Sequence, residues 1–499
     1  MTDATEHSLL EAVLAAPDDE SPRLAYAAHL TGRGDPRGEF IRIDCEMERL
    51  LAADPRSDRT PRWRELDARR MELLGAHDRE WLAPLEALGV SDPGDACLYR
   101  NGFVEHLTLA DGEVLTQRAA ELFAALPLLR DVSLGYGVSL DAAALAARPE
   151  TVRLRSLSVS GGGLGLEALE DFLSVRLPKL ENLEILGSEF GGAGVAVLAR
   201  GTFPSLRKLG LDYCSLGPRG VEALAAAPFL PQLTELDLGS NKCGSEALER
   251  LLAVPGFAPS VLALGSNELG PEAFECLARW ANGRALRELK AETNSAWSDG
   301  AAALAGSPHL TGLTLLDLSG NELEPEGAAA LAKAGFGDLR TLILARNGVG
   351  DDGAAALARA ALPALRALDL SGNFIRDAGL TAFAAATGLP GLAELNLNDN
   401  RIGSAGAAAL SKAAFPLADL KLGENRIGPE GVEALVGSAF WPALAELDLQ
   451  DNPLGEAGGR TLASATAGPA LRHLRLSPKG LPREIRAALR ERYGDVLSL

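Results

Sequence analysis

The sequence is constrained most by one residue that recurs at a nearly fixed interval. An Asn returns every 25 to 27 residues through the second half of the chain, at the end of the same short pattern. The pattern reads L-x-x-L-x-L-x-x-N-x-(I/L/V), followed by a Gly-containing turn and G-x-x-A-(L/F), as in the stretches from Leu365 and from Leu392. The positions are Asn241, Asn267, Asn294, Asn321, Asn347, Asn373, Asn400, Asn425 and Asn452. A period of this size indicates stacked repeats, each of which buries its apolar face against its neighbours.

Weaker copies extend the repeat in both directions. The Asn column continues upstream through residues that replace Asn: Cys214, Ser188, Gly162, Gly137 and Gly112. Downstream it ends at Lys479, after a final L-x-x-L-x-L unit. We therefore expect about 15 strands between Val104 and Leu476.

Each repeat has the pattern of a short strand, a turn and a helix. Alternation places Leu368 and Leu370 on one face of the strand and Asp369 on the other. Asn373 lies where the chain leaves the strand, and its amide can bond to backbone groups that would cost about 1–3 kcal/mol if buried unpaired. Gly379 is expected to open the return helix.

The spacing of the elements predicts the architecture. Parallel strands stack about 4.8 Å apart, whereas packed helices need about 8–10 Å. We therefore expect an α/β solenoid, curved like a horseshoe, with a concave parallel sheet and convex helices.

These motifs resemble the leucine-rich repeat family. The G-x-x-A-L tails at Gly353 to Leu357, Gly406 to Leu410 and Gly431 to Leu435 resemble the ribonuclease-inhibitor-like branch, which implies a full helix in each repeat. The resemblance covers roughly three quarters of the chain. It implies a fold and says little about function.

Residues 1–102 do not follow the repeat and read as helices. The stretch EHSLLEAVLAA should turn Leu9, Leu10, Val13 and Leu14 inward. A polar break at Asp54 to Thr60 precedes the segments TPRWRELDARRMELLGAH and REWLAPLEALG. The segments LLEAVLAAPDDESPRLAYAAHL, GDPRGEFIRI and YRNGFVEHLTL resemble the bacterial repeat-companion domain, found at the N-terminus of leucine-rich repeat proteins in planctomycete-type genomes. Two roles are open: a helical cap over the first strand's edge, or a docking module centred on GDPRGEF.

The predicted organisation has three parts. Residues 1–102 form the helical N-terminal domain, 103–480 the repeat solenoid, and 481–499 a C-terminal capping helix. The capping helix is indicated by Leu481, Ile485, Leu489 and Tyr493, which recur every four residues.

Composition limits the possible partners. The net charge is −20, and no basic stretch stands out, so we expect no nucleic-acid partner. The chain has no apolar run of about 18–20 residues, and its start lacks the features of a signal peptide, so we expect no membrane span and a cytoplasmic location. We also expect a monomer. The five cysteines include no CxxC pair and fit a reducing compartment.

The sequence carries no enzyme signature. It contains no GxSxG, no Walker-type GxxxxGK[ST] and no metal-ligand spacing of its six histidines. We therefore expect no catalytic activity, cofactor or metal.

The expected binding surface is the concave sheet face. Its outward positions are mostly acidic, with Lys290 and Lys421 as exceptions: Asp212, Tyr213, Glu235, Asp237, Glu288, Glu292, Asp317, Asp369, Glu394, Asn396, Asp399, Asp419, Glu424, Glu446, Asp448 and Asp451. Such a groove would steer a basic partner. Alternatively, Asp in L-D-L is a common filler of such repeats, and a solvated acidic face keeps a protein soluble. The copy KAETNSAWSDGAAAL is unusual, and its Trp297 is expected to fill the apolar turn column or to anchor a partner.

We therefore expect a non-catalytic protein-interaction scaffold that binds a partner with a basic surface. The resemblance leaves alternatives: a small-GTPase regulator resembling Ran GTPase-activating proteins, a ribonuclease-inhibitor-like inhibitor of a basic enzyme, or a secreted effector.

Overall fold

The structure is a computed structural model that describes residues 4–54, 57, 60–465 and 471–499. The chain divides into two compact units, which are described separately. The first comprises residues 1–214 with 227–229, and the second comprises residues 215–226 with 230–499.

The first unit begins with helices α1 (Ala4–Ala15), α2 (Glu20–Gly32), α3 (Pro36–Ala53), α4 (Pro61–Ala87) and α5 (Pro93–Ala96). Side chains of Asp19, Asp35 and Thr60 cap α2, α3 and α4, and proline begins α3 and α4, where its missing N–H is not needed. Helix α4 is continuous through the segments TPRWRELDARRMELLGAH and REWLAPLEALG, and Pro84 lies in its last turn.

The α1–α3 bundle encloses a core that includes Val13, Tyr26, Leu30 and Ile41. Leu14 was expected to point inward but is 38% exposed. Of the four apolar residues predicted to point inward from α1, Val13 alone is fully buried, and Leu9 and Leu10 are half-buried.

A hairpin leads into the repeats of the first unit. Strand β1 (Cys97–Arg100) pairs antiparallel with β2 (Phe103–Leu109) through a two-residue turn in which both Asn101 and Gly102 have positive φ, at 48° and 81°. The edge of β2 is thus covered by a strand, whereas the sequence had suggested helices for this role.

Parallel strands follow β2 in the first unit: β3 (Asp131–Leu134), β4 (Ser156–Ser160), β5 (Asn182–Leu186) and β6 (Lys208–Gly210). The segments between them include α6 (Glu113–Gln117), α7 (Ala119–Ala125), α8 (Ala142–Ala146), α9 (Leu166–Phe172) and α10 (Gly191–Leu198). These helices are short, and Gly takes the Asn column in β2 to β4.

The second unit continues with regular repeats. Its strands are β7 (Glu235–Asp237), β8 (Val261–Ala263), β9 (Glu288–Lys290), β10 (Leu315–Asp317), β11 (Thr341–Ile343), β12 (Ala367–Asp369), β13 (Glu394–Asn396), β14 (Asp419–Lys421), β15 (Glu446–Asp448), β16 (His473–Arg475) and β17 (Leu497–Ser498). Neighbours pair in parallel, and Leu342, Leu368 and Leu395 lie opposite one another across β11, β12 and β13. Each of these central leucines is buried, while its two strand neighbours stay partly exposed.

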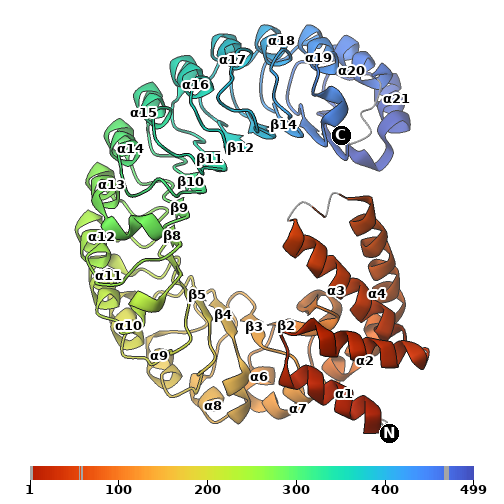
Figure 1. The fold of residues 1–499 in the computed structure, drawn as a ribbon, viewed down its shortest axis with the longest axis vertical. Coiled ribbons are helices and arrows are strands. Elements are labelled where there is room, and N and C mark those ends of the chain that lie inside the picture. The colour runs from red at the N-terminus through yellow and green to blue at the C-terminus, as the bar shows by residue number, and fades with distance from the viewer. Residues whose placement is uncertain (1–3, 55–56, 58–59, 466–470) are drawn as a thin grey trace. The chain divides into compact units, whose positions relative to one another are not determined.

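Helices return the chain between these strands. They are α11 (Gly217–Ala225), α12 (Ser245–Leu252), α13 (Gly270–Arg279), α14 (Trp297–Ala305), α15 (Glu324–Leu331), α16 (Gly350–Ala358), α17 (Asp377–Phe383), α18 (Ser404–Leu410), α19 (Pro429–Val436), α20 (Gly455–Ser464) and α21 (Arg483–Tyr493). Within this unit the strands line the inner side of an arc and the helices its outer side (Figure 1). The predicted α/β repeat solenoid, with helices at its N-terminal end, is confirmed.

The recurring Gly of each repeat tail has a packing role. Helix α17 starts at Asp377, so Gly379 lies inside the helix and does not open it. A Cβ at Gly379 would approach within 2.8 Å of the Ile375 side chain and 2.9 Å of the Asp351 carboxylate. That carboxylate accepts hydrogen bonds from the backbone N–H of Arg376 and Gly379, at 2.7 and 3.1 Å, so this helix start is bonded to the preceding repeat.

The C-terminal helix α21 covers the last repeats with one face. Leu481, Ile485, Leu489 and Tyr493 are buried, and the Tyr493 hydroxyl donates to the Leu462 carbonyl at 2.9 Å. The short strand β17 then pairs with β16.

Candidate functional site

The Asn column is a chain of hydrogen bonds between successive turns. Asn373 is fully buried, and its Nδ2 donates to the carbonyls of Leu344 and Ser371 at 2.8 and 3.1 Å. Its Oδ1 accepts from the backbone N–H of Asn347 and Val349 at 2.9 and 3.2 Å. Each Asn therefore completes the turn of the repeat before it, and the nine Asn residues are at most 8% exposed.

Cys214 occupies the same column at the end of the first unit. Its thiol lies 2.9 Å from the Ile185 carbonyl, and burial raises the pKa of this thiol to about 11. It serves the turn as a buried donor.

The sheet face carries the residues singled out for partner binding. Most are half-buried residues in the strands or, for Asp212 and Glu292, two residues after a strand: Asp212, Glu235, Asp237, Glu288, Glu292, Asp317, Asp369, Glu394, Asn396, Asp419, Lys421 and Glu446. Tyr213, Lys290, Asp399, Glu424 and Asp451 are exposed. Asp448 departs from the expectation because it is only 7% exposed, and its Oδ1 accepts the backbone N–H of Gln450 at 2.9 Å.

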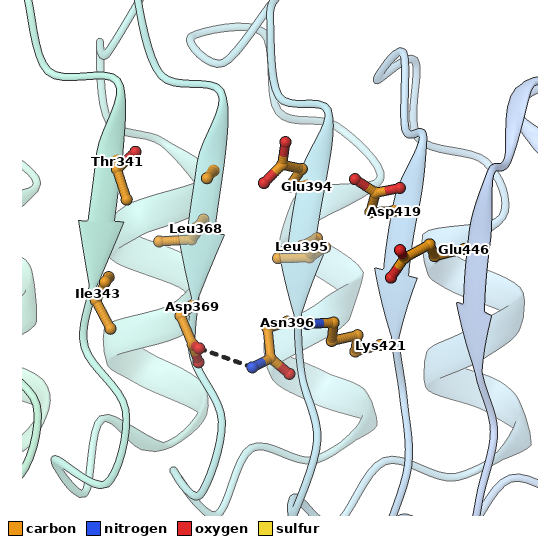
Figure 2. Close-up of a pocket in the computed structure, with 11 residues that line it drawn as sticks. Thr341, Ile343, Leu368, Asp369, Glu394, Leu395, Asn396, Asp419, Lys421 and Glu446 are labelled. Carbon is orange, nitrogen blue, oxygen red and sulfur yellow. Dashed lines mark hydrogen bonds between the residues drawn. The ribbon is translucent and has the colours of Figure 1, made fainter. Parts of the chain in front are cut away.

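Part of this face forms a shallow cavity of about 320 Å³ on β11 to β15. The carboxylates of Glu394, Asp419 and Glu446 project into it from three successive strands (Figure 2). Asp369 lies at the next level, where its Oδ2 accepts a 2.7 Å hydrogen bond from Asn396 Nδ2. Lys421 is the one cation among the lining residues that the structure describes.

The cavity also has an uncharged wall that the sequence analysis missed. Thr341, Ile343 and Ala367 line it on the side of β11 and β12, with Leu368 and Leu395 beneath. The signal was present in the repeat register, because Thr341 and Ala367 align with Glu394, and Ile343 aligns with Asp369. Charge alone does not point to these residues.

The exposed acidic residues Asp399, Glu424 and Asp451 do not line this cavity. They lie in the turns after the strands, in left-handed conformation with φ of 52°, 54° and 52°. The sheet face is thus divided into a cavity at the strands and an acidic margin at the turns.

The Asp of L-D-L has a structural role besides its charge. One carboxylate oxygen of Asp237, Asp317 and Asp369 accepts the backbone N–H two residues later, at 2.8 to 2.9 Å. This supports a structural role for Asp at these positions. The second carboxylate oxygen can still accept a hydrogen bond from another group, as Asp369 Oδ2 does from Asn396.

Glu292 is the unusual carboxylate of this face. Burial raises its pKa above the usual value, and the carboxylates of Asp317 and Asp237 add to the effect. Its side chain covers Gly265, where an added Cβ would overlap Glu292 Oε1. Glu292 therefore needs glycine in the neighbouring repeat.

Trp297 does not fill the apolar turn column. Ala296 does so, fully buried, while Trp297 is 49% exposed and starts α14 with φ of 52°. Several repeats carry Gly at this position, with positive φ at Gly270, Gly350 and Gly455. The register predicted from the pattern was wrong by one residue here.

The GDPRGEF segment is explained by helix packing. Asp35 caps α3 and binds the Arg37 side chain at 2.7 Å, and a Cβ at Gly38 would lie 2.5 Å from the Ala27 carbonyl oxygen. Gly38 thus permits the close contact of α2 and α3.

Metal-binding clusters and membrane-spanning helices are both absent within the described ranges. In residues 4–54, 57, 60–465 and 471–499, no His, Cys, Asp and Glu side chains group to hold a metal ion. Among the same residues, no helix combines the length and apolar character that a membrane crossing needs.

Comparison with protein families identifies the repeats. The family model described as Leucine Rich repeat matches residues 204–225, 309–332, 338–358, 362–384, 392–411 and 416–436. No curated protein matches the chain.

The chain aligns with several solved structures. A chain of the TLR13–ssRNA13 complex is 21% identical with a TM-score of 0.44, and the match covers 75% of this chain and 53% of that one. A chain of the Rad7–Elc1 complex of yeast is 16% identical, with a TM-score of 0.40 and coverage of 75% and 87%. An internalin, inlF, from Listeria monocytogenes is 16% identical, with a TM-score of 0.36 and coverage of 77% and 92%. The match thus spans about half of the first of these chains.

Proposed function

We propose that this chain, whose repeats match the Leucine Rich repeat family model, is a non-catalytic scaffold that binds a partner protein with a basic surface. The observation that carries the proposal is the cavity on β11 to β15, where Glu394, Asp419 and Glu446 project from successive strands beside an uncharged wall. Carboxylates at strand spacing, about 4.8 Å, suit the Lys or Arg side chains of an extended segment or a protein surface. Thr341, Ile343 and Ala367 would contact an apolar side chain of the same partner.

The proposal is tested with a fluorescein-labelled peptide of alternating Lys and Leu, measured by fluorescence anisotropy. We expect salt-sensitive binding to the native protein. The variant Glu394→Gln/Asp419→Asn/Glu446→Gln should bind about tenfold more weakly, because three ion pairs worth about 0.2–1 kcal/mol each sum to about 0.6–3 kcal/mol.

The matched control removes three carboxylates from the helix side of the same unit. Glu326→Gln/Asp352→Asn/Glu433→Gln changes exposed residues of α15, α16 and α19 and leaves the cavity intact. Equal weakening by both variants would mean that net charge, and not the cavity, attracts the peptide. In that case the proposal fails.

The same cavity would serve an inhibitor of a basic enzyme, the ribonuclease-inhibitor-like alternative. This alternative expects a tight, salt-sensitive 1:1 complex, measurable by titration calorimetry. The small-GTPase alternative expects stimulated GTP hydrolysis, and no residue of the cavity favours it.

We further propose that the protein acts as a monomer in the cytoplasm. The five cysteines are free thiols, which supports the reducing compartment. Burial raises the pKa of the Cys45, Cys97 and Cys243 thiols to about 12 and keeps them protonated. The functional segments are proposed to be residues 1–102, 103–480 and 481–499, with the first resembling a repeat-companion domain that caps the repeats.

A further inference from the structure

The first unit carries basic residues in a column just before its strands. Arg130, Arg155 and Arg207 directly precede β3, β4 and β6, and Glu181 occupies the same position before β5. The backbone N–H of Arg155 donates to the Arg130 carbonyl at 2.8 Å, Glu181 to Arg155 at 2.7 Å, and Arg207 to Glu181 at 2.8 Å. These residues are therefore immediate neighbours in space although a whole repeat separates them in sequence.

Two adjoining depressions share Arg130 and Arg155 as a common wall. One, of about 480 Å³, adds the cations Arg100, Arg207 and Lys208. The other, of about 500 Å³, adds Arg153 and Lys179. We call the two together the basic groove. It is unexpected in a chain of net charge −20.

The inner cations of the groove are already compensated. Asp18 lies 2.6 Å from Arg130 and 2.8 Å from Arg155, and these hydrogen bonds lower the pKa of Asp18 to about 2. Arg130 also contacts Glu105, which is buried and binds Arg23. These charges hold the first helices against the strands.

The outer cations are more exposed than Arg130 and Arg155. Arg100, Lys179, Arg207 and Lys208 are exposed at the margins of the groove. Asp131 and Glu181 also line it, so the groove is a mixed surface in which cations predominate. It can attract carboxylates at several separate points.

The groove has an apolar wall beside its cations. Leu14, Pro17, Pro127 and Leu128 line the second depression, and Leu14 is 38% exposed, against the sequence expectation. The Arg153 guanidinium is fixed beside them, 5.0 Å from the centre of the Phe123 ring and hydrogen bonded to the Phe123 carbonyl at 3.4 Å. A ligand there would meet an apolar surface next to ordered positive charge.

We propose that the basic groove binds an acidic segment of a protein that carries an apolar side chain. Carboxylates of the segment pair with Arg207 and Lys208 and with Lys179, and the apolar side chain lies on Leu14 and Leu128. A nucleic acid fits less well, because its continuous phosphates would meet Asp131 and Glu181 and the acidic remainder of the chain. The surface is distinct in sign and in residues from the acidic cavity of the second unit.

The probe is a short fluorescein-labelled peptide of Glu residues around a central Leu-Phe pair. We expect the intact protein to bind the Glu peptide, with an affinity that falls as salt rises. It should bind the same peptide with Gln in place of Glu at least about tenfold more weakly. These comparisons use the native protein alone, so they do not depend on the folding of any variant. Absence of binding at low salt, or equal binding of the Gln peptide, would overturn the proposal.

Variants locate the site. Arg207→Glu/Lys208→Glu should weaken binding at least about tenfold, whereas Lys333→Glu/Arg359→Glu, the same charge change on exposed residues of the second unit, should weaken it less than about twofold. Leu14→Ser should weaken binding a few-fold and leave the salt dependence unchanged. Equal losses of affinity in the two charge variants would overturn the proposal. It would also be overturned if a single-stranded oligonucleotide displaced the labelled peptide at a lower concentration than the unlabelled peptide does.

Discussion

At the scale of single residues, hydrogen bonds between repeats account for the Asn column. Asn373→Ala leaves the N–H groups of Asn347 and Val349 and the carbonyl of Leu344 without these partners in a buried turn. We expect unfolding to cost about 3 kcal/mol less in the variant, as measured by urea denaturation, because each buried unpaired group costs about 1–3 kcal/mol.

Asp399→Lys provides the comparison. Asp399 is exposed in the neighbouring turn, so the change should alter stability by less than about 1 kcal/mol. A loss below about 0.5 kcal/mol for Asn373→Ala would contradict the role assigned to the column.

Glu292 should make stability depend on pH. Its folded pKa is raised by burial, so the carboxylate is neutral in both states below the unfolded value and ionised in both above the folded value. Stability from this group is therefore present at low pH and lost as pH rises through the folded pKa.

The variant Glu292→Gln mimics the neutral form. We expect it to melt at a higher temperature than the native protein at pH 7 and at nearly the same temperature near pH 4, where the native carboxyl is protonated. A higher melting temperature for the native protein at pH 7 would show that the carboxylate is stabilised in the fold.

At the scale of elements, one glycine sets how closely α2 and α3 approach. A Cβ at Gly38 would lie 2.5 Å from the Ala27 carbonyl oxygen and 2.6 Å from the Thr31 backbone nitrogen, so the helices would have to separate. We expect Gly38→Ala to destabilise the first unit by about 1–3 kcal/mol, measured by thermal unfolding.

Gly75→Ala is the matched control in α4. Apart from the adjoining backbone of α4 itself, no atom lies within 4 Å of the position that the added methyl group would occupy, so alanine's better helix propensity should stabilise the protein by up to about 1 kcal/mol. If both substitutions stabilise, the contact between α2 and α3 is looser than described.

Sequence reasoning succeeded where the repeat pattern is regular and failed where it is broken. The strand and helix of each regular repeat follow from buried leucines such as Leu368 and Leu395, whose positions recur. The prediction placed Trp297 in the apolar turn column, one residue too late. Ala296 fills that column, but its small side chain made the larger Trp297 look like the apolar residue of the turn. Asp448 was expected on the exposed face because it shares the column of Asp237, Asp317 and Asp369, and the column does not show how deeply each side chain is buried.

The sequence predicts which side chains lie together on the surface only when they share one register position on successive strands. The acidic cavity could be anticipated, because Glu394, Asp419 and Glu446 share a register position. The basic groove could not be anticipated, because its residues come from outside the repeat: Leu14 from α1, Asp18 from the connection between α1 and α2, and Arg100 from the hairpin. Tertiary contacts of that kind leave no period in the sequence.

At the scale of the whole molecule, excess negative charge should make stability depend on salt. The chain has 68 acidic and 48 basic side chains, so repulsion exceeds attraction over distances longer than single ion pairs. Raising NaCl from about 10 mM to about 150 mM shortens the screening length from about 30 to about 8 Å. We expect the melting temperature to rise by a few degrees in differential scanning calorimetry.

The variant Glu326→Gln/Asp352→Asn/Glu433→Gln serves as the control, because it has three fewer negative charges. Its melting temperature should rise less with salt than that of the native protein. A fall in melting temperature for the native protein would mean that local ion pairs such as Arg69–Glu39, at 2.8 Å, outweigh the general repulsion.

The direction of the Asn hydrogen bonds has a consequence for biosynthesis. Each Asn completes the turn of the preceding repeat, as Asn373 does for the turn of Asn347 and Asn400 for that of Asn373, so every newly translated repeat waits for the next one before its own turn is satisfied. On the ribosome, the turn of the most recently translated repeat would therefore lack its hydrogen bonds to the next Asn, while the turns of earlier repeats have already formed theirs. A translational pause within the array would expose one unfinished turn at a time, a small target for chaperones or proteases.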